Sequence, residues 1–238
     1  MMQQFFNFPT SPTFNFDSFV VCDGNSAALQ FSRSIANQAE PENLLYLYGP
    51  SGSGKTHLLK AIGQELFAAD GISFSYISCR ERFSVEDLIE RFSNSSLLLV
   101  DDLHLLPKDD ALRIGLWQIF NDFYGTGRKI ALAGLYPPRE LSCLDDHLIS
   151  RLLWGLVARV DASDDHSRRM ILKKIADDRQ VRVPDDVMNY ILITTSREVG
   201  DLISCFEALY SLSMSEKRKI TLPLARESRE RQRAGAAQ

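Results

Sequence analysis

Long hydrophobic runs are absent from this 238-residue sequence, and no apolar segment approaches the roughly 20 residues that cross a bilayer. The N-terminus also lacks a basic stretch followed by an apolar one, so no signal peptide is predicted. We therefore expect a soluble, cytoplasmic protein without a membrane partner.

The sequence has few cysteines and no large excess of charge of either sign. The four cysteines lie far apart and form no C-x-x-C pair, which argues against a disulfide framework or a cysteine metal site. The formal net charge is −4, with 27 basic and 31 acidic residues. A broad basic surface is therefore not predicted, and strong direct DNA binding is not expected.

The most informative motif that is present is the stretch GPSGSGKT, followed by a histidine. It comes after the apolar run 44–48 and opens a helix-like run at 57–62. Glycines let the backbone turn so that its N–H groups converge on phosphate oxygens at a helix N-terminus. This context predicts a phosphate-binding P-loop. Its candidate nucleotide-binding residues are Gly49, Pro50, Ser51, Gly52, Ser53, Gly54, Lys55, Thr56 and His57.

Two acids provide the second part of the predicted site. Asp101 and Asp102 close the wholly apolar run 97–100, which is typical of a central parallel strand. Thr56 and Asp101 are the candidate Mg²⁺ ligands, and Lys55 is placed to reach the β- and γ-phosphates. Asp102 is the candidate catalytic residue that orients an attacking water.

Strands and helices alternate along the first two thirds of the chain. Strands are expected at 44–48, 72–78, 97–100, 129–134 and 156–160, with helices at about 26–38, 57–68, 84–92, 109–124 and 144–154. This alternation predicts an α/β fold with a doubly wound parallel sheet. Past Val160 only three helices are expected. The predicted organisation is an extended segment 1–13, an α/β subdomain 14–160, a helical subdomain 161–226 and a disordered tail 227–238.

Several longer stretches resemble one family, the AAA+ ATPase domain of the bacterial replication initiator DnaA. They are FNFDSFVV (14–21), LLYLYGPSGSGKTHLLKAIG (44–63), LLLVDDLHLL (97–106), PPREL (137–141), SRLLWGLVARV (150–160) and VRVPDDVMNYI (181–191). The resemblance implies ATP or ADP with Mg²⁺ as cofactors. It also implies a five-stranded sheet of order 5-1-4-3-2, with a small C-terminal helical lid.

The resemblance also assigns roles to single residues. Arg151 matches the arginine finger, a catalytic residue that reaches a nucleotide held by a neighbouring subunit. Phe19, Val20 and Val21 match the segment that flanks the adenine. Taken without the family, Arg151 is a helix C-terminal arginine, and the three apolar residues are equally suited to the core.

Two positions depart from the family pattern. Leu135 and Gly200 stand where the polar sensor 1 residue and the sensor 2 arginine are usual, so weak intrinsic ATP hydrolysis is expected. Arg197, one turn earlier, is a candidate substitute for the sensor 2 arginine. His147, beside Asp146, replaces another usual arginine.

The family's C-terminal DNA-binding domain has no counterpart here, and the segment 79–96 is too short for the helix that lines the initiator's single-strand path. The chain therefore resembles the truncated, Hda-type regulators. These carry a clamp-binding peptide, which Gln3, Phe6 and Phe8 fit loosely; the alternative is an unstructured or packed aromatic tail.

Three hypotheses of function follow from this resemblance. The first is a regulator of replication initiation that uses the sliding clamp and Arg151 to promote hydrolysis of DnaA-bound ATP. The second is a catalytically decayed nucleotide-binding adaptor of DnaA or the replisome. The third is a helicase-loader ATPase. DnaA is the implied main partner, and self-association is left open.

Overall fold

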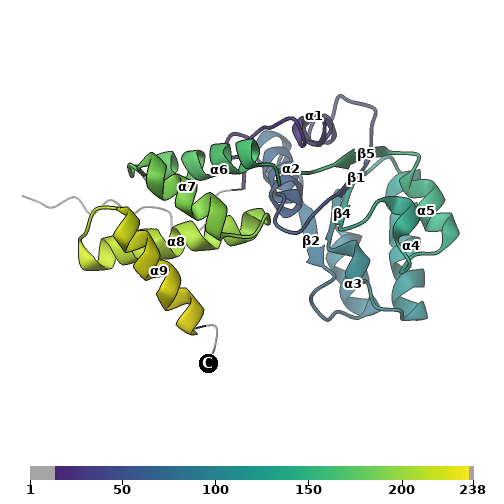
Figure 1. The fold of residues 1–238 in the computed structure, drawn as a ribbon. Helices are drawn as coiled ribbons and strands as arrows, with labels where there is room; N and C mark the ends of the chain where they lie inside the picture. The colour runs from purple at the N-terminus through teal and green to yellow at the C-terminus, as the bar shows by residue number, and fades with distance from the viewer. Residues whose placement is uncertain (1–13, 236–238) are drawn as a thin grey trace, which may run out of the picture.

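The computed structural model describes residues 14–235 and shows a parallel sheet beside a helical lobe (Figure 1). The proposed clamp peptide, with Gln3, Phe6 and Phe8, lies outside the described residues. Within them, no helix is long and apolar enough to cross a membrane.

Five strands form the sheet in the order β2-β3-β4-β1-β5, and every neighbouring pair is parallel. This is the predicted order 5-1-4-3-2 read from the other edge, and the prediction is confirmed. The strands are β1 (Leu44–Tyr48), β2 (Phe74–Ser78), β3 (Leu97–Asp101), β4 (Lys129–Gly134) and β5 (Leu156–Arg159).

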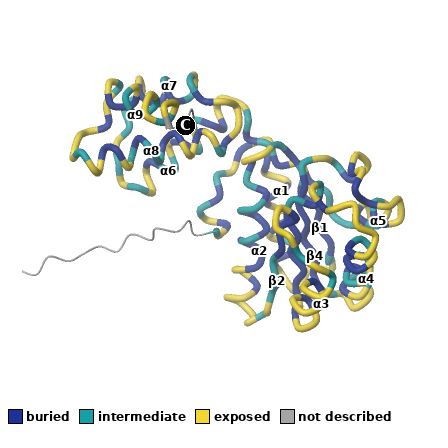
Figure 2. Tube along the Cα trace, turned by 90° about the horizontal axis from the view of Figure 1, so that it is seen from below, coloured by how far each residue is buried: buried dark blue, intermediate teal, exposed yellow. Residues whose placement is uncertain are grey.

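Helices cover both faces of the sheet, because the central strands β3 and β4 are buried throughout and apolar except for Asp101 and Lys129. One hydrophobic core joins the sheet to α1 (Ser26–Ile35) and α2 (Lys55–Asp70). The core of the opposite face joins it to α3 (Val85–Ser93), α4 (Asp110–Gly125) and α5 (Asp146–Leu152). Figure 2 shows the strands as the buried centre of this larger lobe.

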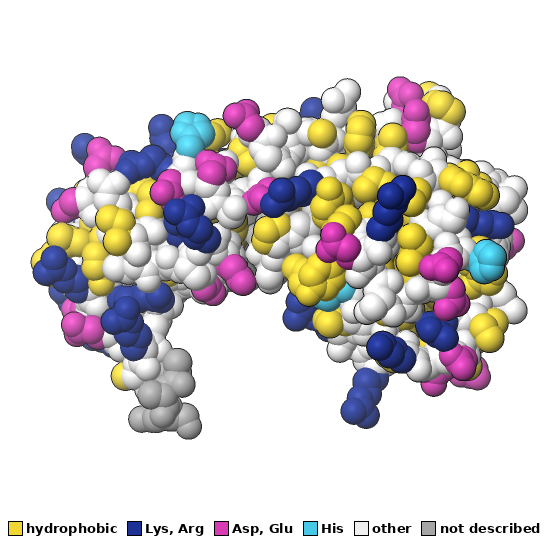
Figure 3. Space-filling view, turned by 45° about the vertical axis from the view of Figure 1, so that its right-hand side comes forward, with side chains coloured by type: hydrophobic (Ala, Val, Ile, Leu, Met, Phe, Trp, Pro, Cys, Tyr) yellow, Lys and Arg dark blue, Asp and Glu magenta, His cyan; other side chains and the backbone are white. Residues whose placement is uncertain are grey.

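The second lobe has its own core and is built from α6 (Asp165–Asp178), α7 (Asp185–Thr194), α8 (Val199–Glu216) and α9 (Leu222–Gly235). We refer to these four helices as the lid. The prediction of only three helices here is wrong. Basic and acidic side chains are interspersed over both lobes in the view of Figure 3.

The prediction of a disordered tail is also wrong for residues 227–235, which form most of α9. Leu224 and Ser228 of α9 are buried against the other helices of the lid, and the Arg229 guanidinium donates to the Thr194 carbonyl at 2.9 Å. Arg231 pairs with Glu227 one turn earlier. The polar composition of residues 227–235 gave no sign that they pack as a helix, because only a few of their side chains contact the other lid helices.

Candidate functional site

The P-loop runs from β1 into α2, as predicted, and Lys55 is the first residue of that helix. Gly52 and Gly54 have φ angles of 70° and 104°, which residues with a Cβ rarely adopt. Lys55 is only 8% exposed, and its ammonium donates to the carbonyls of Gly49 and Pro50 at 2.8 and 2.7 Å. Burial lowers the pKa of Lys55, whereas the nearby Asp101 and Asp102 carboxylates raise it.

Asp101 is a buried hub at the end of β3, with 1% of its surface exposed. Its carboxylate accepts from the Thr56 hydroxyl at 2.5 Å and from the Tyr76 hydroxyl at 3.0 Å. Two hard oxygen donors therefore lie side by side at the start of α2, which suits a Mg²⁺ ion that completes its shell with phosphate oxygens and water. Tyr76 was missed by the sequence analysis, although it precedes the carboxyl end of β2.

Asp102 is held by a side chain that the sequence analysis did not identify. Arg80 donates to its carboxylate from Nε at 2.7 Å and from Nη2 at 3.3 Å. The Ser78 hydroxyl adds a third hydrogen bond at 3.2 Å. The role of Asp102 in orienting water stays a prediction, since Arg80 occupies both of its oxygens in this state.

Leu135 brings no polar side chain to the cleft, but a histidine stands beside it. The Leu135 N–H donates to His104 Nδ1 at 3.2 Å, and His104 also lines the cleft. Burial lowers the pKa of His104, which favours the neutral imidazole. His104 follows Asp102 by two residues, so its place near the strand ends was the available signal.

The P-loop and the lid face each other across a cleft of about 850 Å³. Gly52 lies so close to the start of α8 that an added Cβ would be 2.5 Å from the Gly200 nitrogen. Gly200 therefore seats the lid directly on the P-loop and offers no charged group. Ile171 and Ile203 contribute apolar surface from the lid side of the same cleft.

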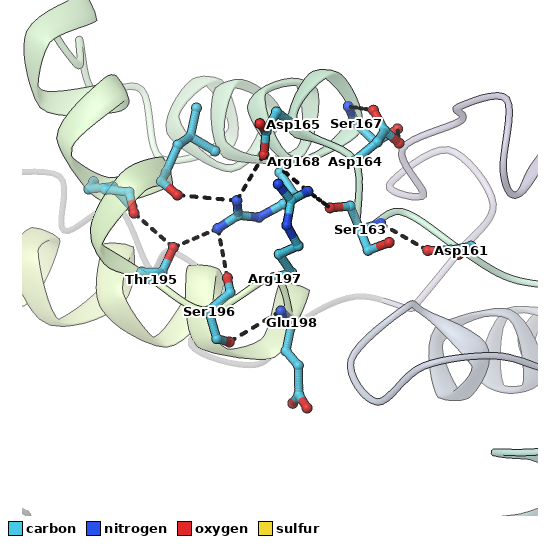
Figure 4. Close-up of polar contacts among 12 residues, drawn as sticks. Asp161, Ser163, Asp164, Asp165, Ser167, Arg168, Thr195, Ser196, Arg197 and Glu198 are labelled. Atoms are coloured by element: carbon cyan, nitrogen blue, oxygen red, sulfur yellow. Dashed lines mark hydrogen bonds and ion pairs between the residues drawn. The ribbon is translucent and has the colours of Figure 1, made fainter.

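Arg197 does not take the place of the missing arginine. Its guanidinium lies 3.3 Å from the Ser163 carbonyl, at the connection between the two lobes, and Arg197 is not among the residues that line the cleft. The neighbouring Arg168 is buried and donates to Thr195 and Ser196 at 2.7 Å each (Figure 4). These arginines hold the loop that precedes α8.

The N-terminal segment closes the other side of the cleft. The Asn25 side chain donates to the Val20 carbonyl at 3.0 Å and accepts from the Cys22 N–H at 2.8 Å, which fixes the backbone between them. Asn25 occupies the N-cap of α1, but its side chain makes no cap hydrogen bond.

The structure brings two of the three predicted adenine-flanking residues to the cleft. Phe19 packs over Gly54, and Val20 lines the cleft beside it. Val21 is 44% exposed and is not a lining residue. His57 lines the cleft between the Phe14 and Phe19 rings, with Nε2 at 2.8 Å from the Asn15 carbonyl oxygen. Burial lowers the pKa of His57.

Arg151 lies outside the cleft, on α5. It donates to the Asn121 side chain, and its guanidinium carbon lies 4.8 Å from the Trp117 ring centre and 5.4 Å from that of Trp154. Trp154 is 61% exposed. Arg151 itself is half-buried between these aromatic rings and is not among the residues that line the cleft of its own chain.

Two family models match the chain. The model "Bacterial DnaA ATPase domain" matches residues 10–159, and the model "Hda, lid domain" matches residues 165–228. The chromosomal replication initiator protein DnaA of Geobacter sulfurreducens is 29% identical over 229 residues. That match covers 91% of this chain and 52% of the relative, so the chain spans about half the length of the relative.

Solved structures agree with these matches. Domain III of the Thermotoga maritima replication initiation protein DnaA superposes with a TM-score of 0.82 at 25% identity, covering 93% of this chain and 97% of the other. The AMPPCP-bound DnaA from Aquifex aeolicus has a TM-score of 0.76 at 24% identity, covering 94% of this chain and 71% of the other, and shows a shared fold.

Proposed function

The chain belongs to the bacterial DnaA ATPase-domain family, and from this premise we propose that it regulates replication initiation by promoting hydrolysis of ATP bound to DnaA. ATP or ADP binds in the cleft between the P-loop and the lid, with Mg²⁺ held by Thr56 and Asp101. The nucleotide bridges both lobes and stabilises the chain by linkage. Its own turnover is slow, because Leu135 and Gly200 bring no charge to the transferring phosphate.

The observation that carries this proposal is the position of Arg151. The side chain is half-buried between Trp117 and Trp154 and does not line its own cleft, which supports a role at a nucleotide held by another subunit. Arginine fingers supplied by a partner accelerate phosphoryl transfer by about 10³–10⁵. Residues 3–8 recruit the sliding clamp in this proposal, which brings the regulator to DnaA on DNA.

Single-turnover hydrolysis of labelled ATP on the cognate DnaA tests the proposal. The full chain is added with clamp loaded on DNA, beside Arg151→Ala, Arg151→Lys and a deletion of residues 1–8. Arg91→Ala is the matched control, because Arg91 is exposed on α3 of the same subdomain. We expect stimulated hydrolysis that Arg91→Ala keeps and that Arg151→Ala and the deletion abolish. Absence of stimulation by the unmodified chain would overturn the proposal.

A nucleotide-binding adaptor is the second candidate, favoured by the uncharged Leu135 and Gly200 positions and by the engagement of Asp102 with Arg80. In this case the nucleotide orders the cleft, and Arg151 only stabilises a contact. The same assay separates the candidates, because an adaptor binds DnaA without accelerating hydrolysis. Normal DnaA turnover with Arg151→Ala also supports the adaptor. A helicase loader instead predicts hydrolysis stimulated by DNA and a helicase contact.

A further inference from the structure

The Arg80 side chain is a largely exposed cation that lines the cleft beside the P-loop. Arg80 follows the carboxyl end of β2 and lines the cleft together with Lys55, Asp101 and Asp102. Its side chain is 62% exposed, whereas that of Asp102 is 16% exposed. Only the Asp102 carboxylate engages its guanidinium in the described structure, so the cation is held by one partner at an otherwise open position.

The other basic side chains among the described cleft residues belong to the lid or to the P-loop and its helix, apart from His104 beside Leu135. Among the described lining residues, Lys174 and Arg179 belong to the lid and pair with their own acids, Asp178 at 2.6 Å and Glu207 at 2.9 Å. Lys55 is the cation of the P-loop itself. Arg80 is therefore the one described arginine that the α/β subdomain contributes to the cleft.

The positive charge of Arg80 affects the pKa of the P-loop lysine. Burial is the main cause of the lowered Lys55 pKa, and Arg80 lowers that pKa further while Asp101 and Asp102 oppose the change. The Arg80 charge acts in the same direction on His104, beside Leu135. Asp102 directly follows Asp101, which accepts from Thr56 at the start of α2, so the guanidinium held by Asp102 lies beside the position proposed for the Mg²⁺ ion and the terminal phosphate.

We propose that Arg80 recognises the γ-phosphate, so that it distinguishes a nucleoside triphosphate from a diphosphate. With a diphosphate bound, Arg80 stays on Asp102. With a triphosphate bound, the guanidinium transfers to two γ-phosphate oxygens, because its planar fork matches phosphate and the phosphate carries more charge than one carboxylate. The inference rests on the proposed nucleotide binding and adds a reader of the nucleotide state to that site.

The transfer also releases Asp102. Once Arg80 leaves, the carboxylate keeps the Ser78 hydrogen bond and regains an oxygen that accepts a proton from water. Because the Arg80 side chain is mostly exposed, its movement requires no repacking of the core. The pair thus holds the site in a resting state until a triphosphate enters.

Equilibrium binding of ATP and of ADP, each with Mg²⁺, tests the proposal on the full chain. Arg80→Ala is expected to weaken ATP binding by about tenfold, the lower end of the effect of a charged hydrogen bond, and to leave ADP binding within about twofold. Arg80→Lys is expected to recover part of the ATP preference. Arg82→Ala is the matched control, since Arg82 is exposed two residues away and does not line the cleft.

A double-mutant cycle with Asp102→Asn tests whether Asp102 acts only by repelling the γ-phosphate. The single substitution frees Arg80 from its partner and is expected to raise the ATP:ADP preference. That rise should disappear in Arg80→Ala/Asp102→Asn. A rise that persists without Arg80 would mean that Asp102 merely repels the phosphate, and it would overturn the proposal.

Two further outcomes are distinguishable. If Arg80→Ala weakens ATP and ADP equally, or weakens neither, Arg80 does not read the γ-phosphate while the nucleotide site itself stands. If the unmodified chain binds neither nucleotide, the proposed nucleotide site fails, and the role of Arg80 fails with it. Thermal unfolding of each variant without nucleotide reports whether the fold is kept.

Discussion

At the scale of single residues, one buried carboxylate connects the P-loop to two strands. Asp101 accepts hydrogen bonds from Thr56 on α2, from Tyr76 on β2 and from the backbone N–H of Asp102 at 2.8 Å. A carboxylate so completely surrounded by donors is held in one orientation before any ion arrives. The contact between Asp101 and Thr56 thus prepares the proposed Mg²⁺ position.

We expect Asp101→Asn to remove the effect of Mg²⁺ on ATP binding. The amide has nearly the shape of the carboxylate but lacks its charge, so the variant keeps the packing and loses the attraction for the ion. Isothermal titration with and without Mg²⁺ should show about tenfold tightening in the unmodified chain and almost none in the variant. Asp110→Asn, on an exposed carboxylate of α4, is the control. Equal dependence of ATP binding on Mg²⁺ in all three proteins would show that Asp101 does not hold the ion.

We expect His57 to make the stability of the chain depend on pH. Burial lowers its pKa from 6.5 in the folded chain, so between the two pKa values the unfolded chain binds more protons. Stability is then present above pH 6.5 and is lost as the pH falls below it. Urea unfolding from about pH 7.5 to about pH 5.5 should show this loss, and His57→Gln should reduce it. His147→Gln, on the exposed face of α5, should leave the loss unchanged.

At the scale of elements, the N-terminal end of α8 rests on the P-loop. Gly200 stands against Gly52, and the loop before α8 is held by the buried Arg168. The close approach depends on Gly52, because an added Cβ there would lie 2.5 Å from the Gly200 nitrogen. A Cβ added at Gly200 would lie 3.9 Å from the Gly52 Cα, which is an ordinary van der Waals distance.

Two glycines with similar φ angles allow the cost of backbone strain to be distinguished from the cost of a clash with α8. Gly71→Ala, at φ 65° with no atom within 4 Å of the added Cβ, should lower the free energy of unfolding by about 1 kcal/mol. Gly52→Ala, at φ 70°, should cost this amount and also push α8 away, because its Cβ would lie 2.5 Å from the Gly200 nitrogen. Faster proteolysis of the 161–164 connection, seen for Gly52→Ala alone, would report the displaced lid. Equal behaviour of the two variants would contradict this contact.

At the scale of the whole molecule, the chain forms two lobes with separate cores, and the cleft lies where the lobes meet. The nucleotide proposed for the cleft contacts both lobes, so its binding links their stabilities. The last helix belongs to this arrangement, since α9 packs on α7 and α8.

Removal of residues 227–238 should therefore destabilise the lid. The deletion exposes the surface under Ser228 and leaves the Thr194 carbonyl without the Arg229 donor, which together should cost about 2 kcal/mol. Denaturant unfolding followed by circular dichroism measures the loss, with a chain shortened only by residues 236–238 as reference. An unchanged unfolding free energy would show that this part of α9 contributes nothing to the lid.

The sequence by itself determined the sheet, its strand order through the family resemblance, and the P-loop with Asp101. These features depend on local patterns: apolar runs of strand length, glycines at a tight turn and acids at a strand end. The tertiary structure alone decided that Arg80 holds Asp102, that Tyr76 reaches Asp101 and that Arg197 binds the Ser163 carbonyl. It also decided that α9 is ordered. Each of these contacts joins residues more than 20 positions apart in the sequence, so its existence depends on how the elements pack, which no local pattern in the sequence records.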